Sequence, residues 1–361
     1  MITKEHDFTF LDTYPLKRLG PVEKLLFFDI ETTGFSRGHS LVYLIGCVFF
    51  RNHSWHLTQW FADTPKAEQQ ILETFVGFAE DFSVLIHFNG DRFDIPFLQK
   101  RCEVHGLSWD VSPFSSVDIY KRIQPCRKLL GLESLKQKSV ESFLGISRQD
   151  TYSGGELIQV YNDYLTTRED ALYDMLMLHN REDLEGMPLI LPILSYPDFL
   201  DGDFTLEGQR LLNETTLDLT LKSPFCLPGD IGWHTSKGHF KAHGHMLFAL
   251  LPVFEGTLKH FYPDYKDYYY LIYEDMAVHK SVGEYVDKTA RKKATAKTCY
   301  TRQASRFILQ PENLWSPFFQ KEYRDPRQYI PYSPQLFEDP QNLEAYVSWL
   351  LERPVKAQDG R

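Results

Sequence analysis

The first part of the chain alternates short apolar runs with turn-forming residues. Apolar runs at 25–31, 41–50 and 54–61 are separated by segments rich in Gly, Ser and Asn, which predicts three strands joined by turns. After Pro65 the apolar residues recur every three or four positions, which predicts a helix. The apolar run at 83–89 then predicts one more buried strand.

Helical spacing dominates from residue 95 onward, over the ranges 95–105, 132–144, 155–165 and 169–194. Strands followed by helices that pack on them are typical of a mixed α/β domain. We therefore expect an N-terminal arm over 1–23 and an α/β domain over 24–197.

The composition changes after Pro197 towards aromatic residues, histidine and proline. Short alternating stretches at 239–245 and 268–273 predict strands, and the spacing over 343–351 predicts a terminal helix. We therefore expect a second, mostly β unit over 198–361.

Composition limits the class of protein. The apolar content of 43% and charged content of 24% are those of a globular protein. No apolar run reaches the roughly 18–20 residues that cross a bilayer, and the first residues lack the pattern of a secretion signal. The five cysteines are scattered and form no C-x-x-C pair, which predicts reduced thiols in a cytoplasmic protein.

The formal net charge of −10 does not by itself exclude a nucleic-acid partner, because basic residues are clustered. The stretch Lys288–Arg306 has seven basic residues and no acid. With Tyr285, Tyr300 and Phe307 beside it, the stretch could contact a phosphate backbone, or it could be a solvated loop or helix face.

Candidate chemistry begins at Asp29-Ile30-Glu31, where an apolar strand ends. Alternation along a strand places Asp29 and Glu31 on one face, and two adjacent carboxylates at a buried strand end favour a hard divalent cation between them. Two solvated acids are the simple alternative. Downstream, Asp94 lies where a loop enters a helix, and His179 and Asp183 are one helical turn apart.

Taken together, these residues resemble the DEDD 3′–5′ exonucleases of the ribonuclease H-like fold. Asp29 and Glu31 match the first motif of that family. Asn89, Phe93 and Asp94 match its second motif, and His179 with Asp183 match the third.

A narrower resemblance is to the bacterial YprB-like ribonuclease H-like proteins. It rests on Ser134-Leu135-Lys136, on the segment from Ser153 to Leu165 and on Asn180-Arg181-Glu182-Asp183. The resemblance covers about 20–197, and it implies a mixed sheet flanked by helices in that part of the chain.

The family resemblance implies phosphodiester hydrolysis with two Mg²⁺ or Mn²⁺ ions held by Asp29, Glu31, Asp94 and Asp183. His179 would orient or deprotonate the attacking water. However, His179 precedes Asp183 by four residues, which is the spacing of the tyrosine-type enzymes, whereas the histidine type has five. This leaves the general-base role open. Asp118 is either a supporting acid of the site or the N-cap of the next helix.

We therefore expect a metal-dependent nuclease, a 3′–5′ exonuclease acting on single-stranded DNA or RNA. The alternatives are a nucleic-acid-binding protein with a degenerate catalytic domain and a structure-specific endonuclease. The expected nucleic-acid contacts are Asn89, Lys292, Lys293, Lys297 and Arg302.

Overall fold

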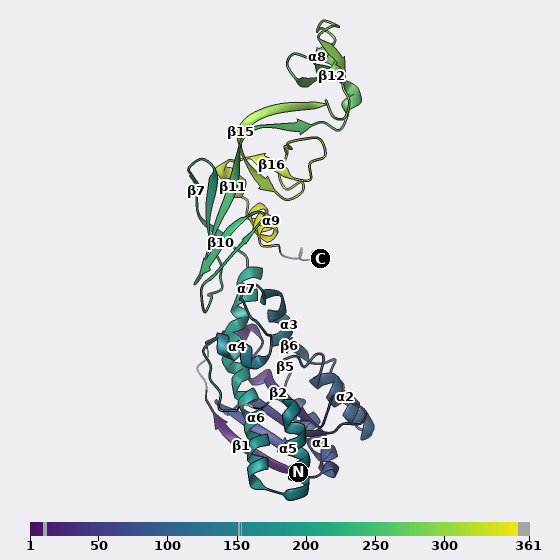
Figure 1. Cartoon of the computed structure of the whole chain (residues 1–361), viewed down its shortest axis with the longest axis vertical. Coiled ribbons are helices and arrows are strands. Elements are labelled where there is room, and N and C mark those ends of the chain that lie inside the picture. The colour runs from purple at the N-terminus through teal and green to yellow at the C-terminus, as the bar shows by residue number, and fades with distance from the viewer. Residues whose placement is uncertain (10–12, 151, 153, 353–361) are drawn as a thin grey trace. The chain divides into compact units, whose positions relative to one another are not determined.

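The computed structural model describes residues 1–9, 13–150, 152 and 154–352, so Ser153 lies outside the described residues. The chain divides into two compact units, unit 1 from Met1 to Pro197 and unit 2 from Asp198 to Arg361 (Figure 1).

Unit 1 contains, in its described residues, a six-stranded mixed sheet in the order β1-β4-β3-β2-β5-β6. The pairs β1–β4, β4–β3 and β3–β2 are antiparallel, whereas β2–β5 and β5–β6 are parallel. The strands are β1 (Ile2–Phe8), β2 (Leu25–Thr32), β3 (Val42–Arg51), β4 (Ser54–Phe61), β5 (Val84–His87) and β6 (Ser115–Asp118).

The N-terminal stretch differs from the expected arm. Residues Ile2–Phe8 form β1, which pairs with β4 over its whole length, from Ile2 opposite Phe61 to Phe8 opposite Trp55. The physical reason is that β4 would otherwise leave a row of unpaired backbone groups at the sheet edge, and β1 satisfies them.

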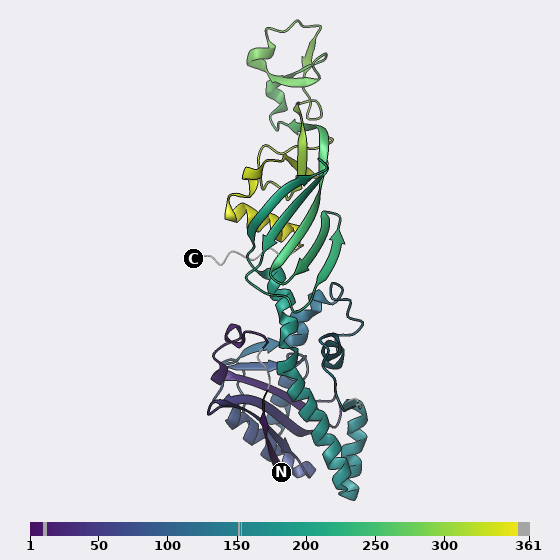
Figure 2. The same ribbon diagram turned by 90° about the vertical axis from the view of Figure 1, so that its left-hand side faces the viewer.

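Helices cover both faces of this sheet (Figures 1 and 2). Phe28 and Ile30 of β2 belong to the core that packs against α1 (Glu68–Ala79) and α2 (Asp94–Val104). On the other face, Tyr43 stacks on Tyr161 with ring centroids 4.2 Å apart. This second core includes α5 (Gly154–Thr167) and α6 (Asp170–Ile190). The expected mixed α/β class is thus confirmed.

The helix predicted over 132–144 is shorter than expected. Only α4 (Gln137–Phe143) is helical there, because Lys136 is extended and Gly131 adopts a positive φ of 63° that ends the preceding turn. Short α3 (Ile119–Ile123) precedes this segment. After α6 the chain continues through a 3₁₀ turn (Leu191–Leu194) into α7 (Ser195–Asp201).

Unit 2 is mostly β, as expected. Its described residues form a seven-stranded sheet, in which β16-β15-β11-β10-β9 are neighbours and β8 pairs with both β11 and β7, and a three-stranded sheet β13-β12-β14. All of these pairs are antiparallel. The strands are β7 (Thr205–Leu212), β8 (Thr216–Lys222), β9 (Ile231–Thr235), β10 (Gly238–His243), β11 (Met246–Phe261), β12 (Tyr268–Leu271), β13 (Met276–His279), β14 (Arg291–Lys293), β15 (Tyr300–Gln310) and β16 (Gln328–Pro331).

The described part of unit 2 also includes the end of α7, the short α8 (Lys280–Gly283) and the terminal α9 (Pro340–Leu350). The alternation expected over 239–245 is present in β10, where Phe240 and Ala242 are buried and His239 and Lys241 are exposed. Among the described helices of the whole chain, none has the length and apolar character needed to span a bilayer.

Candidate active site

Strand β2 presents two carboxylates to the face of the sheet that α6 covers. Ile30 lies in the core beneath α1, so the neighbouring Asp29 and Glu31 point to the opposite side, as strand alternation requires. Glu31 is buried and Asp29 is partly buried. Both side chains line a cleft of about 500 Å³.

Helix α6 approaches β2 and β3 closely because residue 46 is a glycine. A Cβ at Gly46 would lie 2.3 Å from both Asn180 Oδ1 and Leu184 Cδ1 of α6. With that space free, Asn180 Nδ2 donates to Asp29 Oδ2 at 2.9 Å, and Gln59 Nε2 donates to Asn180 Oδ1 at 2.9 Å. The close packing therefore fixes the distance between α6 and the carboxylate of Asp29.

Two further carboxylates complete the acidic lining of the cleft. Asp94 is the first residue of α2, and its Oδ1 accepts a hydrogen bond from the Ile30 N–H at 3.3 Å. Asp183 comes from α6, one turn after His179. Asp29, Glu31, Asp94, His179 and Asp183 all line the same cleft, as does Asn89, which has a positive φ of 66°.

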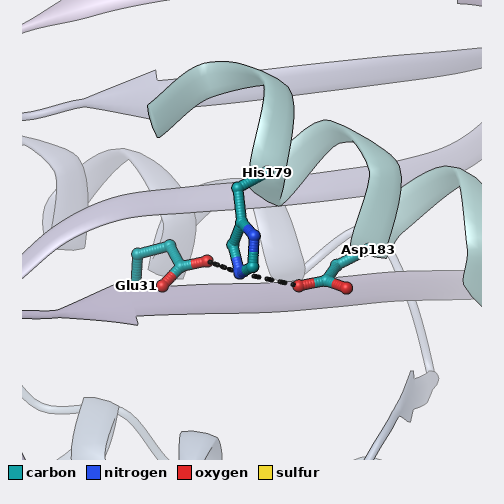
Figure 3. Close-up of side chains that lie close together, drawn as sticks. All are labelled: Glu31, His179 and Asp183. Carbon is teal, nitrogen blue, oxygen red and sulfur yellow. Dashed lines mark ion pairs between the residues drawn. The ribbon is translucent and has the colours of Figure 1, made fainter. Parts of the chain in front are cut away.

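The side chains of Glu31, His179 and Asp183 converge on one position (Figure 3). His179 Nε2 lies 3.5 Å from Glu31 Oε1 and 3.4 Å from Asp183 Oδ2. One ligand atom from each residue lies within 4.8 Å of the other two. This arrangement suits a shared water or cation better than direct hydrogen bonds.

The carboxylates are electrostatically crowded. Burial raises the pKa of Asp29 well above its ordinary value, and the neighbouring carboxylates of Asp94, Asp183 and Glu31 raise it further. The pKa of Glu31 is also well above its usual value, first because of burial and then because of Asp183 and Asp94. Burial raises the pKa of Asp94 to about 7.

The donor set fits a hard divalent cation. Within the described part of the chain, the Glu31 carboxylate accepts no hydrogen bond, and His179 Nε2 approaches its Oε1 to 3.5 Å. Buried carboxylates without donors are costly, and a cation bound by their oxygens removes that cost. This reason applies most directly to Glu31. Asp29, Asp94 and Asp183 already accept from Asn180, Ile30 and Arg148, and they add further carboxylate oxygens to the same cleft.

Sequence reasoning missed the loop between α4 and α5. Arg148 donates to Asp183 Oδ1 and to the buried carboxylate of Glu141. Asp150 accepts from His179 Nδ1 at 2.6 Å and from Lys138 Nζ at 2.9 Å. Burial alone would raise the pKa of Asp150, but hydrogen bonds from Lys138, Tyr152 and His179 lower it overall. The sequence between the two helices contains only two charged residues, Arg148 and Asp150, and no motif marks them.

Asp118 has the N-cap role that was one of its two interpretations. It is the N-cap of α3 and accepts a hydrogen bond from the Lys121 N–H at 3.2 Å. It also accepts from the N–H groups of Asn89 at 2.9 Å and Asp91 at 3.3 Å, so it shapes the loop that leads to Asp94. It is not among the residues that line the acidic cleft.

The predicted basic contacts lie in unit 2 and are strand residues or their neighbours, not a helix face. Lys292 and Lys293 are exposed on β14, and Lys292 Nζ lies 5.1 Å from the centre of the Tyr270 ring. Lys297 is exposed in the segment before β15. Arg302 pairs with Asp275 at 2.8 Å, so its charge is already compensated.

Comparison with known proteins adds a family match. The family model described as the RNase_H superfamily matches residues 26–194, the range that carries all four carboxylates and His179. No curated protein matches the chain.

Among solved structures, the chain is similar to the family B DNA polymerase from the hyperthermophilic archaeon Pyrobaculum calidifontis, with 14% identity and a TM-score of 0.41. The similarity covers 68% of this chain and 35% of the polymerase chain, so the match spans about a third of the polymerase. The ribonuclease H-like fold and the family match support a nuclease, a class that binds nucleic acid.

Proposed function

We propose that the protein is a metal-dependent 3′–5′ exonuclease that hydrolyses single-stranded DNA or RNA, and that it belongs to the YprB-like group of DEDD nucleases. One observation carries the proposal: four carboxylates and one histidine line a single cleft, and the pKa values of Asp29, Glu31 and Asp94 are raised there. We further propose a catalytic domain over 24–197 and an accessory domain over 198–361.

Each residue of the cleft has a distinct part in this proposal. Asp29, Glu31, Asp94 and Asp183 would hold two Mg²⁺ or Mn²⁺ ions, which when bound acidify water and stabilise the negative charge of the leaving oxygen. Asn180 fixes the carboxylate of Asp29 by donating to Oδ2. His179 Nε2 faces the point where Glu31 and Asp183 converge, and there it orients the attacking water and accepts its proton.

The rest of the cleft suits an unpaired nucleotide. Phe35 is 81% exposed and packs edge-on against Phe93, and both rings line the cleft. Exposed rings stack on unpaired bases without regard to sequence. Lys136 and Asn89 also line the cleft and offer donors to phosphate oxygens. These features support a single-stranded substrate.

We propose that unit 2 guides the nucleic-acid substrate. Lys292, Lys293 and Lys297 are exposed and bind phosphate in this proposal, whereas Arg302 contributes less because it pairs with Asp275. We place the protein in the cytoplasm, a proposal that the scattered cysteines without a C-x-x-C pair support.

The test is cleavage of 5′-labelled single-stranded DNA and of the matching RNA with Mg²⁺, Mn²⁺ or EDTA, beside the Asp29→Ala variant. We expect a metal-dependent ladder that shortens from the 3′ end and is lost in the variant. A substrate with a blocked 3′ end checks polarity. A few discrete fragments would instead indicate an endonuclease, and binding without cleavage would indicate a degenerate domain.

A further inference from the structure

The loop between α4 and α5 is fastened to one face of α6 at three side chains. We call residues Arg148–Asp150 the docking loop. Asp150 contacts His179, Arg148 contacts Asp183, and the Glu182 carboxylate accepts from the N–H groups of Gln149 at 3.0 Å and Asp150 at 2.8 Å. Positions 179, 182 and 183 lie on one side of a helix, so the docking loop covers the side that also faces the cleft.

The Asp150 carboxylate holds one particular nitrogen of the imidazole. Asp150 Oδ2 lies 2.6 Å from His179 Nδ1, and both side chains are buried. The same oxygen accepts from Lys138 Nζ at 2.9 Å, while Oδ1 accepts from the Tyr152 N–H at 3.0 Å. A carboxylate that already receives a lysine ammonium and a backbone donor can only accept, so the proton of this contact belongs to Nδ1.

We propose that Asp150 is a positioning residue that keeps the neutral His179 in the tautomer with its proton on Nδ1, so that the unprotonated Nε2 faces Glu31 and Asp183. The catalytic part of this inference rests on the proposed hydrolysis. In that reaction an O–H bond of water breaks and an N–H bond forms at Nε2. The hydroxide oxygen bonds to phosphorus as the bond to the 3′-oxygen breaks, and the leaving oxygen takes a proton from solvent.

This assignment explains how a histidine four residues before Asp183 can serve the reaction. The spacing alone does not determine which imidazole nitrogen carries the proton, because a neutral imidazole can carry it on either one. The buried carboxylate of Asp150 behind the ring makes that choice, and the imidazolium formed after proton transfer remains paired with it.

The test uses Asp150→Asn in the full-length protein. The Tyr152 N–H still needs the Oδ1 acceptor, so the new amide group faces His179 and Lys138 and donates where the carboxylate accepted. We expect the proton to move to Nε2. The kcat should fall about 10²–10⁴-fold, the usual contribution of a general base, with little change in KM.

The matched control is Glu182→Gln, which weakens the docking loop without touching the imidazole. If Asp150 acted only by fastening the loop, the two variants would behave alike. We expect Glu182→Gln to keep the wild-type tautomer and most of kcat.

The tautomer is read directly by long-range ¹H–¹⁵N NMR of the histidine rings with Mg²⁺ present, at a pH where His179 is neutral. The chain has 13 histidines, so the His179 signal is assigned by its loss in His179→Gln. A wild-type Nε2–H tautomer overturns the inference, as does an Asp150→Asn variant with unchanged tautomer and kcat. If the tautomer switches in an otherwise inactive protein, the proposed function fails while the positioning role of Asp150 stands.

Discussion

The described residues of unit 1 contain two groups of one histidine and two acids, and the groups differ in what their oxygens contact. Glu31, His179 and Asp183 form one group, and His87, Asp91 and Asp118 form the other. In each group, one ligand atom from every residue lies within 4.8 Å of the others. Residue types and spacing alone would therefore suggest a metal site in both places.

In the second group, the acceptor atoms receive hydrogen bonds from other groups of the protein. Asp118 accepts three backbone N–H groups, and Asp91 accepts from Ser116 Oγ and from Lys121 Nζ. His87 Nδ1 accepts from the Gly90 N–H at 3.0 Å. Burial alone would raise the pKa of Asp91, yet hydrogen bonds from Ser116 and Lys121 lower it overall.

The first group differs at Glu31. Asp183 pairs with Arg148 and His179 with Asp150, but Glu31 accepts no hydrogen bond from the described residues, and burial and the carboxylates of Asp183 and Asp94 raise its pKa. The contrast teaches that unmet acceptor capacity, not the presence of histidine and acids, distinguishes a candidate metal site from a structural one.

The largest expected difference between the groups is in catalysis. Asp183→Asn should lower cleavage by about 10³-fold or more, since several kcal/mol of charge stabilisation by metal is lost at 1.36 kcal/mol per tenfold in rate. Asp91→Asn is the matched control and should retain activity. The comparison breaks down if both variants cleave the labelled strand equally well.

The next difference is in folding, where the two groups should respond with opposite sign. Asp118→Ala leaves three backbone donors without their acceptor, so the free energy of unfolding should fall by about 3 kcal/mol. Glu31→Ala removes a crowded carboxylate and should leave the metal-free protein as stable or more stable. Urea unfolding with EDTA present measures both, and a loss of stability in Glu31→Ala would contradict this prediction.

Metal binding gives a third difference. At a free Mg²⁺ concentration of 100 times Kd, the wild-type protein should gain about 2.7 kcal/mol of stability by mass action. Glu31→Gln should lose most of this gain, whereas Asp91→Asn should keep all of it. Thermal unfolding with and without Mg²⁺ measures the gain. If Mg²⁺ raises the unfolding temperature of Glu31→Gln as much as that of the wild type, Glu31 is not a metal ligand.

The smallest expected effect is the pH dependence of the metal-free protein. The pKa of Asp94 is about 7 in the folded state and 3.8 as an ordinary aspartate in the unfolded chain, so the unfolded chain loses its proton first as pH rises. The stability contributed by the protonated carboxyl is therefore present at low pH and disappears as pH approaches 7. Between pH 5.5 and 7 the loss should be about 2 kcal/mol.

Asp94→Asn isolates this contribution. The stability difference between wild type and variant should change by that amount over the same pH range with EDTA present, as measured by urea unfolding. A difference that stays constant with pH would show that Asp94 does not titrate there.

Local periodicity was enough to predict much of unit 1. The alternation in β2 and the helical spacing in α6 follow from neighbouring residues, so the strand, the helix and the shared face of Asp29 and Glu31 were accessible from sequence. The same reasoning located Asp94 at the start of a helix.

The remaining features depend on long-range contacts. Asp150 and His179 are 29 positions apart, and Arg148 and Asp183 are 35 apart, so no local pattern links either pair. The pairing of β1 with β4 spans an even longer stretch of chain, which is why Ile2–Phe8 was expected to be only an arm. The short α4 likewise reflects turns that apolar spacing alone did not reveal.

Gly46 makes the site vulnerable to mutation at a position that takes no part in its chemistry. Any side chain there would meet the buried ends of Asn180 and Leu184, so these side chains would have to shift. A shift of Asn180 would break the hydrogen bond that it donates to Asp29 Oδ2 and would disturb the acidic cleft. A genetic screen for inactive variants should therefore recover Gly46 alongside the carboxylates, although its backbone pairs normally in the middle of β3.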